Sequence, residues 1–165
     1  MIELIVLDVD GTLTDGKITY DSNGVETKSF DVADGLAIAV WTKKFGKKAA
    51  IITGRNSTVV EKRAKELGIN HLHQGINDKQ KVLNDILEKE GLNFSQVAAI
   101  GDDLNDYNML KKAGLSFAPS NASSYIQDIV NVTCKNSGGD GAVREMLEYI
   151  FKEDGLEEDF IKAWQ

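Results

Sequence analysis

The sequence is poor in cysteine, in proline and in long apolar runs. Cys134 is the only cysteine and Pro119 the only proline in 165 residues. One cysteine excludes a disulfide bond within the chain, and one proline gives no support to a proline-rich linker. No apolar run approaches the about 20 residues that a membrane helix requires, and the first apolar segment is too short for a signal peptide. We therefore expect a cytoplasmic protein with no membrane partner.

Positive charge is also scarce. The chain carries 19 lysine and arginine residues against 26 aspartate and glutamate residues, so its net charge is −7. Because there is no basic stripe, we expect no binding to nucleic acid or to an anionic membrane surface. The acidic balance does not exclude an anionic small molecule, since a local metal ion and local cations decide that binding. The length fits one domain with a single core.

The chain alternates short apolar runs with longer amphipathic segments. The apolar runs lack polar alternation, which predicts strands buried on both faces. They cover Leu4–Asp8, Lys48–Thr53, His71–Gln74, Val97–Gly101, Leu115–Ala118 and Val130–Cys134. Helical patterns cover Gly35–Phe45, Ser57–Leu67, Lys79–Glu90, Asn105–Lys112, Ser123–Ile129 and Gly141–Lys152. This order predicts an α/β fold with an open, mostly parallel, Rossmann-like sheet and helices on both faces.

One segment interrupts this order. Lys17–Asp21 and Val25–Phe30 flank Ser22-Asn23-Gly24, and Asn-Gly between alternating runs predicts a β-hairpin. The hairpin is inserted between the first strand and the first helix. We expect one core domain over residues 1–153, with the hairpin insertion at 17–30. Residues 154–165 form an acidic, amphipathic tail, which is either a loose end or an arm that docks on a neighbouring molecule through Phe160, Ile161 and Trp164.

Polar residues gather where the predicted strands end. Ligands of open α/β sheets bind beyond the carboxyl ends of the strands, so these side chains are predicted to face one crevice. Carboxylates that converge there would repel one another without a cation, and an all-oxygen set of ligands favours Mg²⁺ over zinc. The segments are Asp8-Val9-Asp10-Gly11-Thr12, Thr53-Gly54-Arg55 and Gly101-Asp102-Asp103, with Lys79 at the start of the helix after the third strand.

A magnesium-bound cluster of this composition suits phosphoryl transfer. Asp8 is predicted to be the nucleophile, because a carboxylate can form an aspartyl-phosphate. Asp10 is placed to protonate the leaving alcohol and then to deprotonate water. The Thr53 hydroxyl and the Lys79 ammonium group are predicted to bind phosphate oxygens, and Asp102 to complete the metal site. Two glycines let the backbone approach the phosphate closely, Gly11 and Gly54.

Each motif alone is a weak signal. An isolated Asp-x-Asp-Gly is also typical of Ca²⁺-binding loops and Asx-turns, and Lys79 alone would be an ordinary solvated helix residue. The conjunction of several strand ends favours a functional site. His71 and His73 share a strand face but have no third ligand near them in the sequence, so we interpret them as structural. A packing role is also expected for Trp41 and Tyr107.

The motifs resemble those of the haloacid dehalogenase-like phosphatases over essentially the whole chain. DVDGT is similar to the first motif of that superfamily, ITGR to the second, Lys79 to the third and GDDLND to the fourth. The resemblance implies that Asp8 is the nucleophile and Asp10 the acid/base. It also implies Mg²⁺ contacts from Asp8, Asp102 and the backbone carbonyl of Asp10, with Asp103 as a further carboxylate near the metal.

The chain closely resembles the capless 3-deoxy-D-manno-octulosonate 8-phosphate phosphatases. The similar segments are LTDGKITYDSNGVETKSFDVADGLAI, ITGRNSTVVEKRAKELGI, GDDLNDYNML and SGGDGAVREML. The resemblance implies hydrolysis of this eight-carbon sugar-acid phosphate for lipopolysaccharide biosynthesis. It also implies a homotetramer whose hairpins pack together and whose subunits help to close each other's sites. The implied substrate contacts are Asp10, Asp34, Gly35, Gly54, Arg55, Arg63, Lys79 and Asn105.

Two departures from that family bear on the sugar. Basic residues are usual where this chain has Ala33 and Ala39. Relatives that act on nine-carbon 2-keto-3-deoxy sugar acid 9-phosphates, of the KDN or N-acylneuraminate type, also lack them, but tend to carry Glu at the position of Arg55. A bidentate arginine suits a carboxylate. Arg55 therefore favours the octulosonate, and the nine-carbon substrate stays the alternative.

Two other classes of protein share parts of the pattern. A response-regulator receiver domain combines clustered aspartates, Mg²⁺, a threonine and a lysine. Its acidic pair ends the first strand and its phosphorylated aspartate ends a later one, which is the reverse of the order here. A phosphomutase uses the same nucleophile but must shield its phosphoenzyme from water, and the sequence shows no cap for that. A Mg²⁺-dependent phosphatase is therefore the leading prediction.

Overall fold

The computed structural model describes every residue from Met1 to Gln165. Six parallel strands form one sheet in the order β5-β4-β1-β6-β7-β8. The central strand β1 pairs with β4 and β6, and Leu4 is in register with both Lys48 and Val97. The predicted open, parallel α/β sheet is confirmed. The strand bounds are β1 Leu4–Leu7, β4 Lys48–Ile52, β5 His71–His73, β6 Val97–Ile100, β7 Leu115–Ala118 and β8 Val132–Thr133.

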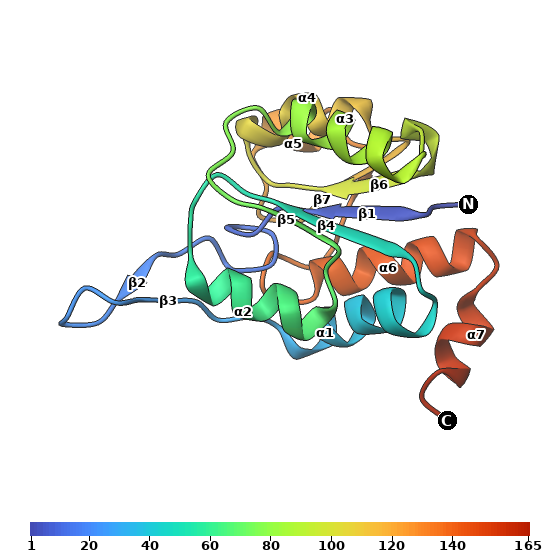
Figure 1. Cartoon of the computed structure of the whole chain (residues 1–165), viewed down its shortest axis with the longest axis horizontal. Helices are drawn as coiled ribbons and strands as arrows, with labels where there is room; N and C mark the ends of the chain where they lie inside the picture. The colour runs from blue at the N-terminus through green and yellow to red at the C-terminus, as the bar shows by residue number, and fades with distance from the viewer.

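Helices cover both faces of this sheet (Figure 1). One face carries α1 Val32–Ala39, α2 Thr58–Leu67 and α6 Ala142–Glu153, and the other carries α3 Lys79–Glu90, α4 Tyr107–Lys112 and α5 Ser124–Gln127. Each face has its own apolar core, with Trp41 and Phe151 in the first and Leu83 and Met109 in the second. All residues of β1 and β6 are buried, as their unbroken apolar sequence predicts.

The start and the end of the first helix differ from the prediction. The helix begins at Val32 rather than at Gly35, because Asp31 caps it by accepting a hydrogen bond from the Asp34 N–H (2.9 Å). It continues as a π-helical segment, η1 Val40–Lys44. Two short 3₁₀ segments complete the elements, η2 Phe94–Gln96 and η3 Leu104–Asp106.

The predicted hairpin is present, with shorter strands than expected. It pairs β2 Thr19–Tyr20 with β3 Glu26–Thr27 in antiparallel orientation. The Asp21 carboxylate organises the turn by accepting hydrogen bonds from the N–H groups of Asn23 and Val25 (2.8 and 2.9 Å). The hairpin projects from the side of the sheet where β1 ends (Figure 1). It therefore stands beside the edge at which the polar strand ends gather.

The C-terminal tail contains the helix α7 Glu157–Lys162. The Phe160 ring stacks on Phe151 of α6, with 4.6 Å between ring centroids, and its residue is 7% exposed. This part of the tail is therefore packed on its own chain and is no loose end. Ile161 and Trp164 stay more than half exposed (55% and 53%), so their docking on a neighbour stays a prediction. None of the helices has the length and apolar character that spanning a membrane requires.

Candidate active site

The carboxyl ends of β1, β4 and β6 surround one cavity of about 290 Å³. Strand ends that are far apart in the sequence meet there, as predicted from the parallel sheet. No hydrophobic residue lines it, so the cavity suits a charged or hydroxylated ligand. Its lining consists of Asp8, Asp10, Gly16, Thr53, Gly54, Arg55, Asp102, Asp103 and Asn105.

Asp8 and Lys79 form a buried ion pair at this cavity. Asp8 directly follows β1, its side chain is 6% exposed, and its Oδ1 accepts a hydrogen bond from Lys79 Nζ (2.7 Å). Lys79 is the first residue of α3, and Asp78 caps that helix through a bond from the Lys81 N–H. The Lys79 ammonium group also donates to Asp106 Oδ1 (2.6 Å). A buried cation is thereby held between two carboxylates, which fixes the position of the Asp8 oxygens.

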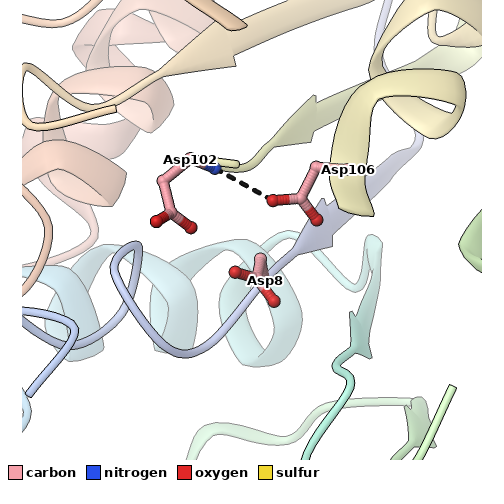
Figure 2. Close-up of side chains that lie close together, drawn as sticks. All are labelled: Asp8, Asp102 and Asp106. Atoms are coloured by element: carbon pink, nitrogen blue, oxygen red, sulfur yellow. Dashed lines mark hydrogen bonds between the residues drawn. The ribbon is translucent and has the colours of Figure 1, made fainter. Parts of the chain in front are cut away.

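Asp106 is a site residue that the sequence did not single out. It is fully buried, and its Oδ2 accepts hydrogen bonds from the N–H groups of Asp102 (3.0 Å, Figure 2) and Asp103 (3.3 Å). A Cβ at Gly101 would lie 2.5 Å from the Asp106 carboxyl carbon, so only glycine fits there. The available sequence signal was the capping-box spacing from Asp103 to Asp106. Asp106 therefore orients both Lys79 and the loop that carries Asp102.

The donor set fits the predicted magnesium ion. Asp8, Asp102 and Asp106 each bring a carboxylate oxygen within 4.8 Å of the others (Figure 2). Both oxygens of Asp106 already accept hydrogen bonds, which leaves Asp8 and Asp102 to bind a cation. The single ammonium group of Lys79 does not balance three carboxylates, and hard oxygen donors beside a cavity with room for water suit Mg²⁺.

Burial dominates the pKa values in this cluster. It raises the pKa of Asp8 to about 7, although the charge of Lys79 opposes the rise. It raises the pKa of Asp106 to about 6, and the Asp8 charge adds to that rise while Lys79 opposes it. For Lys79, burial lowers the pKa, but the charges of Asp8 and Asp106 outweigh burial and raise it above its ordinary value. The carboxylates therefore depend on nearby positive charge to stay ionised.

Gly11 allows the first and fourth motifs to meet. Its φ is +91°, and a Cβ at this position would lie 2.1 Å from Asp102 Oδ2, so both its conformation and its space require glycine. The Thr12 hydroxyl donates to Asp102 Oδ1 (3.2 Å). The turn after β1 thus holds the Asp102 carboxylate in place toward the cavity.

Several predicted substrate residues do line the cavity. Asp10, Gly54, Arg55 and Asn105 are among its lining residues. The Arg55 side chain is 45% exposed, and its Nη2 lies 2.8 Å from Glu26 Oε2 of the hairpin. The guanidinium group therefore faces the cavity side of the hairpin and is already paired in this chain.

Lys79, also a predicted substrate contact, is not among the lining residues, and its ammonium group is held by Asp8 and Asp106. Three further predicted substrate contacts lie elsewhere in the chain. Asp34 is buried between α1 and α6, where its Oδ1 accepts a hydrogen bond from the Arg144 N–H (2.8 Å). Gly35 lies against Arg63, because a Cβ on it would be 2.3 Å from Arg63 Nη2. Arg63 donates to Asp31 O (3.3 Å) and lines a separate hollow beside the hairpin. The single chain does not bring these three to the cavity, and their role in substrate binding stays a prediction.

Lys28 of the hairpin is a second site residue that the sequence did not single out. Its Nζ donates to Asp10 Oδ1 (2.5 Å), and its side chain is only 1% exposed. Nothing in its sequence context distinguishes it from other lysines, because the contact depends on how the hairpin folds back toward the turn after β1. The two histidines, in contrast, are the first and last residues of β5, and His71 Nε2 is 2.7 Å from Glu90 Oε1. That contact agrees with a structural role.

Known proteins share this sequence and arrangement. A model of haloacid dehalogenase-like hydrolases matches residues 72–146. The 3-deoxy-D-manno-octulosonate 8-phosphate phosphatase KdsC of Escherichia coli K12 is 41% identical over 155 residues, which cover 93% of this chain and 81% of that relative. The chain belongs to this phosphatase family. KdsC of Haemophilus influenzae is 36% identical to this chain, over 98% of this chain and 89% of that relative.

Solved structures agree with this family membership. The phosphatase of Moraxella catarrhalis, crystallised in complex with a magnesium ion, a phosphate ion and a KDO molecule, matches with a TM-score of 0.95 and 43% identity, over 99% of this chain and 94% of that one. The cobalt-bound phosphatase of Haemophilus influenzae matches with a TM-score of 0.89 and 36% identity, over 94% and 91% of the two chains. The family resemblance read from the motifs is therefore confirmed.

Proposed function

We propose that this family member is a Mg²⁺-dependent phosphatase that hydrolyses 3-deoxy-D-manno-octulosonate 8-phosphate through an aspartyl-phosphate on Asp8. The observation that carries the proposal is the buried Asp8 carboxylate, held by Lys79 at a cavity that no hydrophobic residue lines. The names of the relatives and the KDO molecule bound to one of them support the same substrate class. KDO denotes the eight-carbon sugar acid without its phosphate.

The chain's own oxygens would hold the cofactor. Asp8 and Asp102 would bind Mg²⁺ with side-chain oxygens, together with the backbone carbonyl of Asp10. Bound there, Mg²⁺ supplies positive charge to the phosphate oxygens and to the Asp8 carboxylate. Lys79 holds the Asp8 carboxylate through its hydrogen bond to Oδ1. Asp106 holds the backbone N–H of Asp102, and the Thr12 hydroxyl donates to the Asp102 carboxylate.

The reaction divides between two aspartates. One oxygen of Asp8 forms a bond to phosphorus while the bond from phosphorus to the sugar oxygen breaks. Asp10 gives its proton to that sugar oxygen, so the sugar acid leaves as an alcohol. Asp10 then takes a proton from a water molecule, whose oxygen attacks phosphorus and releases phosphate from Asp8. Thr53 and the backbone at Gly54 line the cavity where the phosphate oxygens would lie.

Arg55 is proposed to bind the carboxylate of the sugar acid. It lines the cavity, it is partly exposed, and a bidentate arginine matches a carboxylate. In this chain Glu26 occupies the guanidinium group, so substrate would replace that glutamate. The relatives named for the octulosonate favour this sugar over the nine-carbon alternative.

The proposal also includes that the protein forms a homotetramer and that it acts in the cytoplasm. Apolar side chains are exposed on the hairpin and just after it, at Ile18, Tyr20, Val25 and Val32, with exposed fractions of 39%, 58%, 56% and 82%. Association through the hairpin would bury them. Light scattering on the purified protein tests the number of subunits.

Phosphate release with Mg²⁺ tests the function directly. We expect turnover of octulosonate 8-phosphate to exceed that of nonulosonate 9-phosphates, and to vanish in Asp8→Asn. A preference for a nine-carbon acid would replace the sugar assignment. No release from any phosphorylated sugar acid would refute the proposed function.

A further inference from the structure

A series of ion pairs joins the hairpin to the turn after β1, which carries Asp10 and is here called the catalytic turn. Lys28 Nζ lies 2.5 Å from Asp10 Oδ1 and 2.9 Å from Glu26 Oε1. Glu26 Oε2 lies 2.8 Å from Arg55 Nη2, which also approaches the Tyr20 hydroxyl (3.4 Å). Through these side chains the hairpin contacts both the turn after β1 and the turn after β4.

The burial of Lys28 sets this contact apart from an ordinary surface ion pair. The Lys28 side chain is 1% exposed, whereas those of Asp10 and Glu26 are 21% and 17% exposed. Surface pairs contribute little, because two long side chains must be ordered in a medium of high dielectric constant. A buried ammonium group must keep its partners, since leaving it unpaired is costly. Lys28 is thus confined to one place, and it confines Asp10 Oδ1.

We propose that Lys28 is the positioning residue for the acid/base Asp10, and that the inserted hairpin serves as an internal clamp on the catalytic turn. The proposal rests on the role of Asp10 in the proposed function. Proton transfer requires the Asp10 oxygen to lie within hydrogen-bond reach of the sugar oxygen, and a small misplacement is costly in rate. By holding Oδ1, Lys28 leaves Oδ2 as the oxygen that carries the proton to the substrate.

Glu26 and Arg55 extend the clamp to the substrate side. Glu26 forms ion pairs with both Lys28 and Arg55, so it joins the two cations. When Arg55 exchanges Glu26 for the sugar carboxylate, Glu26 keeps Lys28 as its remaining cation. Substrate binding and the position of Asp10 are therefore joined through one glutamate.

The leaving group distinguishes a positioning role from a purely structural one. A sugar alkoxide needs a proton when it leaves, whereas the nitrophenolate of p-nitrophenyl phosphate is a weak base and leaves without one. A misplaced Asp10 therefore slows phosphoryl transfer from the sugar-acid phosphate but not from the aryl phosphate. It slows the later attack of water in both cases, because that step also uses Asp10. A defect in folding or metal binding would slow transfer from both substrates alike.

The test compares Lys28→Met with wild type, with Lys28→Arg, and with Lys17→Met as a control that removes an exposed positive charge from the same hairpin. In Lys28→Met we expect kcat on octulosonate 8-phosphate to fall by about 100-fold, the usual contribution of general acid–base catalysis. In rapid-mixing experiments with p-nitrophenyl phosphate, Lys28→Met should show a burst of nitrophenolate release before slow turnover. The rate of that burst should stay within about threefold of the wild-type rate. Lys28→Arg should recover part of kcat, and Lys17→Met should match wild type.

Three results would overturn the inference. They are an unchanged kcat in Lys28→Met, an equal loss of the burst rate and of sugar-acid turnover, and a soluble Lys28→Arg with no recovery although it melts like wild type. Failure of the proposed function has a separate signature, since wild type itself would then release no phosphate from the sugar acid.

Discussion

Replacing Asp34 by asparagine should stabilise the protein at neutral and alkaline pH. Asp34 is 1% exposed, its Oδ1 accepts one hydrogen bond from the Arg144 N–H (2.8 Å), and its Oδ2 has no partner. Burial raises the pKa of Asp34 to about 6, and the bond from Arg144 only partly offsets the rise. An asparagine keeps the oxygen that accepts the Arg144 bond and removes a charge that the interior solvates poorly.

The sign and size of the effect follow from the raised pKa. The folded state binds the Asp34 proton more tightly than the unfolded state does, so this group supports folding below its ordinary pKa of 3.8. That support fades as the pH rises and is lost above the folded pKa of about 6. A shift from 3.8 to about 6 corresponds to at most about 3 kcal/mol. Because the new amide group also lacks a partner, we expect a net gain of about 1–2 kcal/mol at pH 8.

Urea unfolding of wild type and Asp34→Asn at pH 5 and pH 8 measures the effect. The gain in the free energy of unfolding should grow by about 1 kcal/mol from the lower to the higher pH, with the same m-value at each pH. A variant that is less stable than wild type at pH 8, or a difference that does not change with pH, would refute the reasoning. The same variant bears on the predicted substrate contact, since a fall in kcat/KM without loss of stability would place Asp34 at the substrate.

Three further predictions concern the metal site, the sugar and the tail. In Gly11→Ala the new Cβ displaces Asp102, so either the Mg²⁺ concentration for half-maximal activity should rise or kcat should fall, in each case by about 10–100-fold. An unchanged Mg²⁺ titration would contradict this. Arg55→Glu should lower kcat/KM for any sugar-acid phosphate by at least about tenfold, and an unchanged value would remove Arg55 from the site. Phe160→Ala should lower the free energy of unfolding by about 2–3 kcal/mol, because it removes the ring stacked on Phe151; equal urea midpoints would show that α7 adds no stability.

The strand ends were predictable because the sheet is parallel and covered on both faces. Unbroken apolar sequence marks such strands, and the first polar residue after each one must lie at the same edge. Asp8, Thr53 and Asp102 were placed correctly for that reason. Element boundaries were less predictable, since the start of α1 depends on the cap that Asp31 provides.

The contacts made by the flanking residues depend on tertiary structure. Lys28 was missed because its partner Asp10 lies on another element, and nothing local separates a buried lysine from an exposed one before the hairpin is folded. Asp106 had a local capping-box signal, but its contact with Lys79 depends on how α3 packs beside the loop. Asp34 and Arg63 were predicted at the substrate by resemblance. In the single chain Asp34 is buried beside α6, and Arg63 donates to Asp31 O beside a separate hollow. Burial and pairing of this kind arise only in the folded chain.

The most direct test of the account is to trap the phosphoryl group on Asp8. Asp10→Asn is the suitable protein, because transfer from p-nitrophenyl phosphate needs no acid whereas the attack of water needs Asp10, so the phosphoenzyme should accumulate. After mixing with Mg²⁺ and that substrate, acid quenching and borohydride reduction convert an aspartyl-phosphate to homoserine, which mass spectrometry locates. We predict homoserine at Asp8 and none when Asp8 is also replaced by asparagine. Release of nitrophenolate with Asp8 unmodified, or modification of another aspartate, would contradict the account.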